Sequence, residues 1–241
     1  MTFSSPSTIL NSMTKNDHTL KDMEIFKAAD HRTRDRLLEA AGILFSEMGF
    51  ERATAREICD VARVNTAAVN YYFGGKRRLY VEVLREAHRR LVNFGALKDL
   101  AENVHATEEM LEEFFAGVLH SILDPSPKRW DLRVILREIA SQTDALEELI
   151  ELQIRPTRDL FRIIIARVMD LPADHEAVTR GAISVVSQFV SLFQNRRTVE
   201  LVNPDLDLRG EGIDKMARHM WRFSVAGLRS VASDFKGEGK T

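Results

Sequence analysis

Residues 64–80 read VNTAAVNYYFGGKRRLY, and they are the part of the chain that decides its interpretation. Three aromatic residues, two glycines and three cationic residues follow one another from Tyr71 to Arg78. Val69 and Phe73 are one helical turn apart, so they predict a short helix with an apolar inner side that ends at Gly74. Aromatic and cationic groups beside one short helix favour a polyanionic partner.

The residues before this stretch predict two further helices. From Thr33, apolar residues recur at three- and four-residue steps as far as Gly49, which is a typical helix stop. Thr54 and Glu57 have the spacing of a capping box. They predict the start of a second helix. Its last apolar residue is Ala62, so the helix should be about two turns long, at about 3.6 residues per turn. Its expected inward-facing residues are Ile58, Val61 and Ala62.

The second and third helices are separated by a tight turn. Asn65 is predicted to cap the third helix, and a fourth helix is predicted from Lys76 to Leu91. Two short helices joined by such a turn are typical of a helix-turn-helix unit, in which the later helix enters the major groove of DNA. The alternative is an ordinary helical corner in a bundle.

The outer face of the third helix has the residue types that a groove-binding helix needs. Thr66 and Ala67 are small, so the backbone can approach base edges, and Asn70 matches the paired donor and acceptor of adenine. The Tyr71 hydroxyl suits a phosphate oxygen, and Lys76 starts a helix whose N-terminus favours an anion. The predicted DNA contacts are Thr54, Arg56, Asn65, Thr66, Ala67, Asn70, Tyr71, Tyr72 and Lys76.

The charge distribution fits either a polyanion partner for one part of the chain or statistical scatter. The 241 residues have a formal net charge of −2, but residues 31–90 contain 12 Lys and Arg against 8 Asp and Glu. The single cysteine, Cys59, excludes an internal disulfide and fits a reducing compartment. We find no apolar run long enough for a membrane span and no signal peptide, so we expect a cytoplasmic protein with no membrane partner.

Residues 33–79 resemble the N-terminal domain of the TetR family of transcriptional regulators. The order and spacing of the family pattern are met by Phe45, Gly49, Thr54, Ile58, Ala62, Val64, Phe73, Lys76 and Leu79. Arg63 stands where the family often has glycine in the turn, so we expect it to adopt a left-handed conformation. Asn70 stands where the family commonly has a phosphate-binding tyrosine. The resemblance implies a regulator, most simply a repressor, that binds a palindromic operator as a homodimer and is released by a small-molecule effector.

The rest of the chain is also predicted to be helical, which makes the fold class all-α. Proline-containing breaks separate helices expected at 107–124, 129–142, 144–170, 174–196 and 212–235, and Pro156 should kink or divide the third of these. We therefore expect three parts: a flexible tail (1–30), a helix-turn-helix DNA-binding domain (31–78), and a larger helical bundle for ligand binding and dimerisation (79–241).

Two late helices are candidates for a dimer interface. Residues 181–195 contain no charge, and small residues recur along them and along the last helix. A helix that is apolar nearly all round needs cover on several sides, and a partner helix would supply it in a two-fold four-helix interface. A fully internal core helix is the alternative. The predicted interface residues are Ser184, Ser187, Ser191, Met216, Met220, Ser224, Gly227 and Val231.

A ligand cavity is expected among the helices between residues 107 and 170. Most of its candidate residues would serve equally well as plain core, and Arg137 and Glu138 could meet a polar group of a ligand or face solvent. The candidates are Phe114, Phe115, Val118, Trp130, Ile135, Arg137, Glu138, Ile139, Phe161 and Ile165.

Two other classes of function remain as alternatives. A helical enzyme is disfavoured because Gly75-Lys76 fails the phosphate-loop pattern, no nucleophile elbow exists, and the seven histidines lack metal-ligand spacing. We therefore predict no catalytic residues, no metal and no cofactor. A protein–protein adaptor that keeps the frame without sequence-specific DNA binding is the second alternative.

Overall fold

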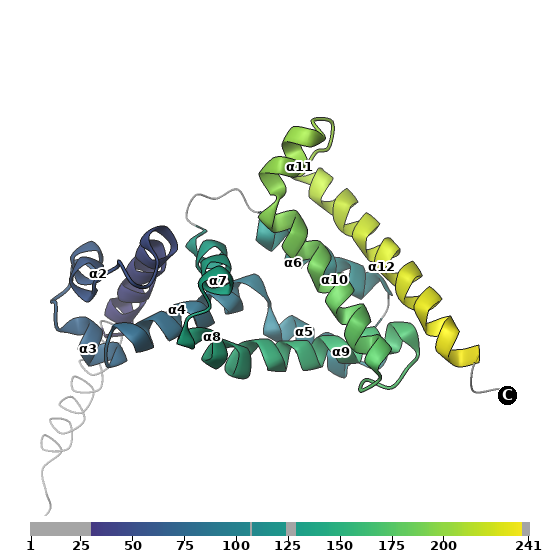
Figure 1. Ribbon diagram of the computed structural model, residues 1–241, viewed down its shortest axis with the longest axis horizontal. Coiled ribbons are helices and arrows are strands. Elements are labelled where there is room, and N and C mark those ends of the chain that lie inside the picture. The colour runs from purple at the N-terminus through teal and green to yellow at the C-terminus, as the bar shows by residue number, and fades with distance from the viewer. Residues whose placement is uncertain (1–29, 107, 124–128, 238–241) are drawn as a thin grey trace, which may run out of the picture. The chain divides into compact units, whose positions relative to one another are not determined.

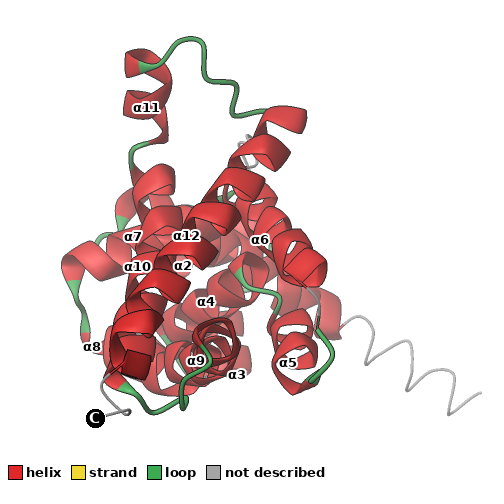
Figure 2. Cartoon of the chain, turned by 90° about the vertical axis from the view of Figure 1, so that its right-hand side faces the viewer, coloured by secondary structure: helices red, strands yellow, loops and turns green. Residues whose placement is uncertain are grey.

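The computed structural model describes residues 30–106, 108–123 and 129–237, and the regular structure within these ranges is helical throughout (Figures 1 and 2). The predicted all-α class is therefore confirmed. The predicted tail lies outside the described residues except for Asp30, which already belongs to the first helix. The contacts group into two units, one ending at Val83 and the other beginning at Leu84, so the division falls inside helix α4. None of the helices described combines the length and the apolar character that a bilayer crossing requires.

The first unit consists of a helix at residues 30–48, α2 (Ala55–Ala62), α3 (Ala68–Phe73) and the start of α4 (Lys76–Leu91). Gly49, with φ of 83°, ends the first helix. The capping box is formed as predicted. The Glu57 N–H donates to Thr54 Oγ1 at 3.2 Å, and the Thr54 N–H donates to Glu57 Oε2 at 2.8 Å. The hydrogen bonds that the Thr54 hydroxyl and the Thr54 N–H donate to the Glu57 carboxylate lower the pKa of Glu57.

The turn between α2 and α3 contains a left-handed residue at the position where the sequence predicted one. Arg63 has φ 54° and ψ 50°, and its N–H donates to the Asp60 carbonyl at 3.1 Å. Asn65 Oδ1 then accepts the Ala67 N–H at 2.8 Å. Asn65 thus caps the turn that leads into α3, although the regular helix begins only at Ala68. Gly74, with φ of 72°, ends α3.

The core of the first unit is built from the inner faces of its helices. Phe45 and Tyr80 meet edge to face with ring centroids 4.9 Å apart, and Ile58, Val69 and Leu79 are also fully buried. Aromatic pairs of this geometry add to the stabilisation from burial.

Two residues of α2 contrast in burial. Cys59 is completely buried, with Sγ 3.7 Å from the Thr66 carbonyl oxygen. The prediction for Val61 is wrong, because its side chain is 53% exposed and lies on the outer side of α2. A helix of only eight residues gives too few turns to fix its inner face from the sequence pattern.

The second unit contains the rest of α4 and eight further α-helices of the described residues. They are α5 (Phe94–Glu102), α6 (Glu108–Leu123), α7 (Trp130–Ser141), α8 (Asp144–Leu149), α9 (Arg155–Met169), α10 (Glu176–Gln194), α11 (Arg196–Val202) and α12 (Glu211–Gly237). The sequence predicted α6 to α10 and α12 within about two residues, as expected for helix ends. It did not predict α5 or α11.

Pro156 divides its helix as expected, and the division takes the form of a π-turn. Residues Ile150–Ile154 form this wider turn, in which the Arg155 N–H donates to the Ile150 carbonyl, and α9 follows directly. Pro156 lies in the first turn of α9, directly after the wider turn.

Helices α6, α10 and α12 pack together in the second unit (Figure 1). At their centre, Phe115 of α6 contacts both Trp221 of α12, at 4.9 Å between ring centroids, and Phe189 of α10, at 5.0 Å. Along the outside of the α6–α12 contact, Arg218 forms an ion pair with Glu112 at 3.0 Å, and His120 Nε2 is hydrogen-bonded to Asp214 Oδ1 at 2.6 Å. α6 is thus fixed along the length of α12.

Candidate nucleic-acid interface

The outer face of α3 and of the turn before it is exposed. Thr66, Ala67, Asn70 and Tyr71 are open to solvent, whereas Ala68, Val69 and Phe73 are buried on the opposite side. The Tyr71 side chain is 78% exposed, and its ring meets that of Tyr72 at a right angle with centroids 4.8 Å apart. The structure therefore brings these four predicted contacts to one accessible face.

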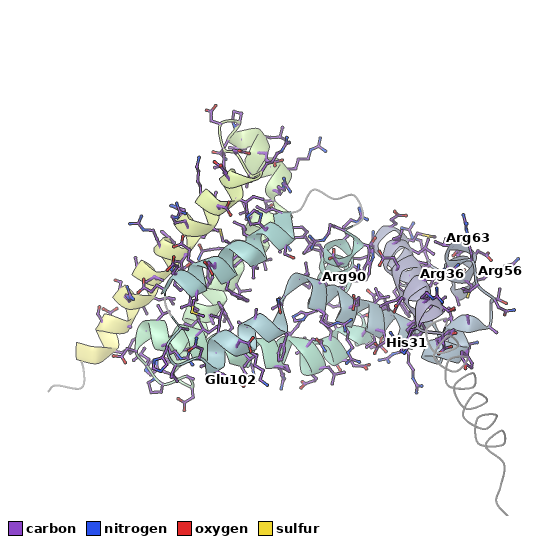
Figure 3. The ribbon with its side chains drawn as sticks, turned by 180° about the vertical axis from the view of Figure 1, so that it is seen from behind. His31, Arg36, Arg56, Arg63, Arg90 and Glu102 are labelled. Atoms are coloured by element: carbon purple, nitrogen blue, oxygen red, sulfur yellow. The ribbon has the colours of Figure 1, made fainter. Side chains whose placement is uncertain are left out.

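The predicted contacts on α2 have different surroundings. Arg56 is exposed in the first turn of α2, and Figure 3 labels it there. The Thr54 hydroxyl is engaged within the protein, since it accepts the Glu57 N–H and donates to Glu57 Oε2 at 2.7 Å. The side chain of Asn65 accepts the Ala67 N–H. Thr54 thus caps the start of α2, and Asn65 caps the turn that leads into α3.

Tyr72 is held by the first helix rather than extended into solvent. It is half-buried, and its hydroxyl donates to Asp30 Oδ1 at 2.7 Å. This hydrogen bond is the main reason why the pKa of Tyr72 is raised. The tyrosine connects α3 to the start of the first helix, a role that the sequence did not indicate.

Lys76 also differs from its prediction. Its ammonium group donates to the carbonyl oxygens of Phe50 at 2.8 Å, Ala53 at 3.1 Å and Glu51 at 3.4 Å. It also lies 4.4 Å from the centroid of the Phe50 ring. The expectation that this side chain reaches outward to an anion is corrected: it fixes the loop between the first helix and α2. The sequence could not predict this role, because the carbonyl groups that Lys76 binds belong to residues more than 20 positions earlier.

The predicted ligand residues are spread between the core and the surface of the second unit. Phe115 and Ile165 are buried in the core of the second unit, and Phe114 and Phe161 pack against it. Val118, Ile135 and Arg137 are half-buried, and Ile139 is exposed. Two hollows, of about 320 Å³ and about 400 Å³, lie in this unit, and neither is lined by any of the ten residues.

Helix α7 carries two buried acidic groups. Glu138 is completely buried and its Oε1 accepts the Thr143 hydroxyl at 2.8 Å. Asp131 is also buried, and its Oδ1 accepts a hydrogen bond from Arg129 Nε at 2.9 Å. Trp130, likewise buried, has the Arg90 guanidinium 4.6 Å from its ring centroid. Glu138 and Trp130 therefore already have partners within the protein, and Arg129 and Asp131 are polar residues of this region that the sequence did not single out.

The predicted dimer residues divide between two sides of α10 and α12. Ser184, Ser187, Ser191, Gly227 and Val231 are exposed, and Met216 is half-buried. Large exposed apolar residues that the sequence did not single out accompany them: Ile183, Val186, Val190 and Phe223. We call the exposed residues of these two sets the α10–α12 face.

Met220 and Ser224 are corrections to the predicted face. Met220 is buried in the core against α6, and the Ser224 hydroxyl accepts Gln188 Nε2 at 2.9 Å within the same chain. Residues four apart in a helix advance about 40° beyond a full turn at each step. Residues chosen at this spacing therefore do not all stay on one face of the helix. The hollow of about 320 Å³ lies along this face, where α9, α10 and α12 meet.

Comparison with known proteins places both parts of the chain in one family. Residues 37–83 match the model of bacterial regulatory proteins of the tetR family. Residues 107–228, about half of the chain, match the C-terminal domain of the HTH-type transcriptional dual regulator CecR.

Curated relatives agree with these matches. The chain is 27% identical over 133 residues to the probable HTH-type transcriptional regulator YttP of Bacillus subtilis, covering 55% of this chain and 63% of that protein. It is 34% identical over 82 residues to the HTH-type transcriptional repressor NicS of Pseudomonas putida, covering 33% and 39%. The chain thus spans less than two thirds of the length of these relatives.

A solved structure shares the fold. The TetR family regulator PfmR from Thermus thermophilus superposes with a TM-score of 0.57 and 20% identity, covering 80% of this chain and 95% of that one. The two family matches, the relatives and the shared fold together show that the chain belongs to the TetR family of transcriptional regulators.

Proposed function

We propose that the protein is a DNA-binding transcriptional repressor that acts as a homodimer in the cytoplasm and is released from its operator by a small molecule. The observation that carries this proposal is the exposed face of Thr66, Ala67, Asn70 and Tyr71 on a short helix whose other side is buried. Small residues at the leading end allow the backbone to approach base edges, and the amide and hydroxyl groups match bases and phosphates.

The α10–α12 face supports the homodimer. Five large apolar side chains are exposed along it, among them Phe223 at 66% and Ile183 at 62%. Neighbouring exposed apolar residues of this size are typical of an interaction surface. A second copy of the chain presents the same face, so a two-fold axis would bury both and place two α3 helices on one palindrome. Half-sites one DNA turn apart, about 34–36 Å, would fit such a pair.

The effector would act by linkage between two sites. A ligand that binds more tightly to a dimer with misplaced α3 helices lowers DNA affinity by that difference in binding free energy. The ten residues predicted from the sequence, from Phe114 to Ile165, remain the proposed lining. The relatives include proteins named as repressors, which supports repression over activation.

The decisive experiment is selection of bound fragments from genomic DNA, followed by binding measurements with a Tyr71→Ala variant. We expect the wild-type protein to select palindromic fragments. A hydrogen bond to a charged group such as a phosphate contributes about 1.5–3 kcal/mol, so Tyr71→Ala should weaken binding about tenfold or more with folding unchanged. Phe94→Ala is the control, because Phe94 is an exposed aromatic residue of the other unit. Equal affinity of all three proteins would reject the interface and favour an adaptor.

A further inference from the structure

Arg63 adopts a backbone conformation that side chains other than glycine rarely take. Its φ of 54° and ψ of 50° lie in the left-handed region, at the end of α2. In this region the Cβ atom crowds the backbone, so glycine would be accommodated with less strain. A strained backbone at a residue with a large side chain is a reason to ask what that side chain contributes.

The turn itself is held by groups other than the Arg63 side chain. Arg36 of the first helix donates through Nη2 to the Ala62 carbonyl and, at 3.2 Å, to the Arg63 carbonyl. The Val64 N–H donates to the Cys59 carbonyl at 3.0 Å. These bonds satisfy carbonyls at the end of α2 and place a positive charge where the helix dipole is negative. The guanidinium of Arg63 is therefore not needed for the geometry of the turn.

The Arg63 side chain points into solvent and is exposed. Among the described residues its guanidinium makes no ion pair or hydrogen bond, even with exposed Asp60 one turn earlier. Arg56, seven residues earlier, lies two helical turns away on the same flank of α2 and is exposed as well (Figure 3). Thr66, which leads into the exposed face of α3, follows Arg63 by three residues.

From this arrangement we propose that Arg63 binds a phosphate of the DNA backbone at the edge of the groove that α3 enters. This inference rests on the function proposed above. A helix-turn-helix unit lays its first short helix across the sugar-phosphate chain, and a guanidinium can donate two parallel hydrogen bonds to one phosphate. The phosphate contact explains why arginine, rather than glycine, occupies a left-handed turn.

The test compares Arg63→Gly, Arg63→Lys and the wild-type full-length protein. Each protein is titrated with a selected genomic fragment and with a mixed-sequence duplex of equal length, over a range of salt concentrations. Each phosphate contact contributes about 0.9 to the slope of log affinity against log salt. Arg63→Gly should therefore reduce the slope by about 1.8 for a dimer, whereas Arg63→Lys should keep it. Arg63→Gly should also weaken binding to both duplexes by a similar factor, roughly 5- to 50-fold, because a phosphate contact carries no sequence information.

Thermal unfolding supplies the structural control. Gln142 has the same left-handed conformation, with φ of 48°, at the end of α7 in the other unit. Gln142→Gly therefore measures the effect of the backbone change alone, and it should leave DNA affinity and the salt slope unchanged. Arg63→Gly should shift the unfolding midpoint no further than Gln142→Gly does. An unchanged salt slope in Arg63→Gly would overturn the inference about Arg63. Absence of salt-dependent binding in the wild-type protein would instead overturn the proposed function.

Discussion

Lys76 holds together three carbonyl groups from the loop that leads into α2. Each of these bonds is made by a charged donor, and such bonds are stronger than those between neutral groups. Since Thr54, the cap of α2, directly follows Ala53, the lysine fixes where α2 begins. Its effect on DNA binding would therefore be indirect, through the position of α2.

Replacing Lys76 by methionine should destabilise the first unit. We expect a loss of about 1–3 kcal/mol in the free energy of unfolding, because partly buried carbonyls lose their charged donor. Urea denaturation followed by circular dichroism measures this change. Arg78→Met is the matched control, since Arg78 is an exposed cation two residues later, and it should change stability by less than about 0.5 kcal/mol. Equal stability of the two variants would contradict the role assigned to Lys76.

His88 should make stability depend on pH. Burial in α4 lowers its pKa from the ordinary value of 6.5, because the charged imidazolium is poorly solvated there. The unfolded chain therefore binds more protons than the folded chain just below 6.5, and stability falls as pH decreases through this range. We expect His88→Leu to flatten the pH dependence of the urea midpoint between about pH 7 and 5. The same titration of His219→Gln, an exposed site, should retain the wild-type slope.

Helices with their own capping and periodicity could be predicted from the sequence, and those that depend on distant partners could not. α2 has a complete capping box, and α6 and α12 have long apolar stripes, so local pattern and final structure agree. α5 is short, and Arg167, from a helix more than 60 residues later, donates to the Leu100 and Asn103 carbonyls near its end. α11 has no buried residue and makes its main contacts with α10, so no core pattern marks it.

The candidate DNA-binding site could likewise be predicted from the sequence only in part. The exposed side of α3 follows from the positions of Val69 and Phe73, and the sequence identified it. The partners of Tyr72 and Lys76 come from Asp30 and from residues 50–53, and only the folded unit brings them close. The predicted ligand residues show that apolar spacing cannot distinguish a cavity lining from a filled core.

Two glycines in helices of the second unit should respond oppositely to substitution. A Cβ at Gly181 would lie 2.5 Å from Leu228 Cδ2 and 3.3 Å from Met169 Sδ, because α10 crosses close to α9 and α12 there. At Gly117 of α6 nothing lies within 4 Å. We expect Gly117→Ala to raise the free energy of unfolding by about 0.5–1 kcal/mol through helix propensity. Gly181→Val should lower it by about 1–3 kcal/mol through overpacking. Urea titration measures both, and changes of the same sign would contradict the packing described.

At the scale of the whole molecule, DNA binding and dimerisation should depend on each other. Under the proposed function, each α3 would read only a few bases, so one chain alone would bind weakly, and the α10–α12 face would supply the second α3. Charges placed on this face should therefore reduce affinity for a palindromic fragment without touching the DNA-binding unit.

Val186→Asp combined with Ile183→Asp should convert the protein into monomers. Two buried, unpaired carboxylates in each chain would oppose association strongly. Sedimentation equilibrium should show a mass near 27.4 kDa instead of twice that value. Val104→Asp is the control, because Val104 is an equally apolar exposed residue outside the face, and this variant should stay dimeric. A double variant that remains dimeric would place the interface elsewhere.

Cys59 gives the protein a built-in probe of local opening. It is the only cysteine of the chain, it is completely buried, and its sulfur lies against the Thr66 carbonyl at the start of the exposed face. A thiol reagent can reach it only when the surrounding structure opens, and separation of α2 from α3 is one such opening, so the labelling rate in the native protein reports how often the first unit opens locally. A bound duplex that holds the two helices together should slow the reaction, and the degree of slowing would measure how strongly the operator stiffens this part of the chain.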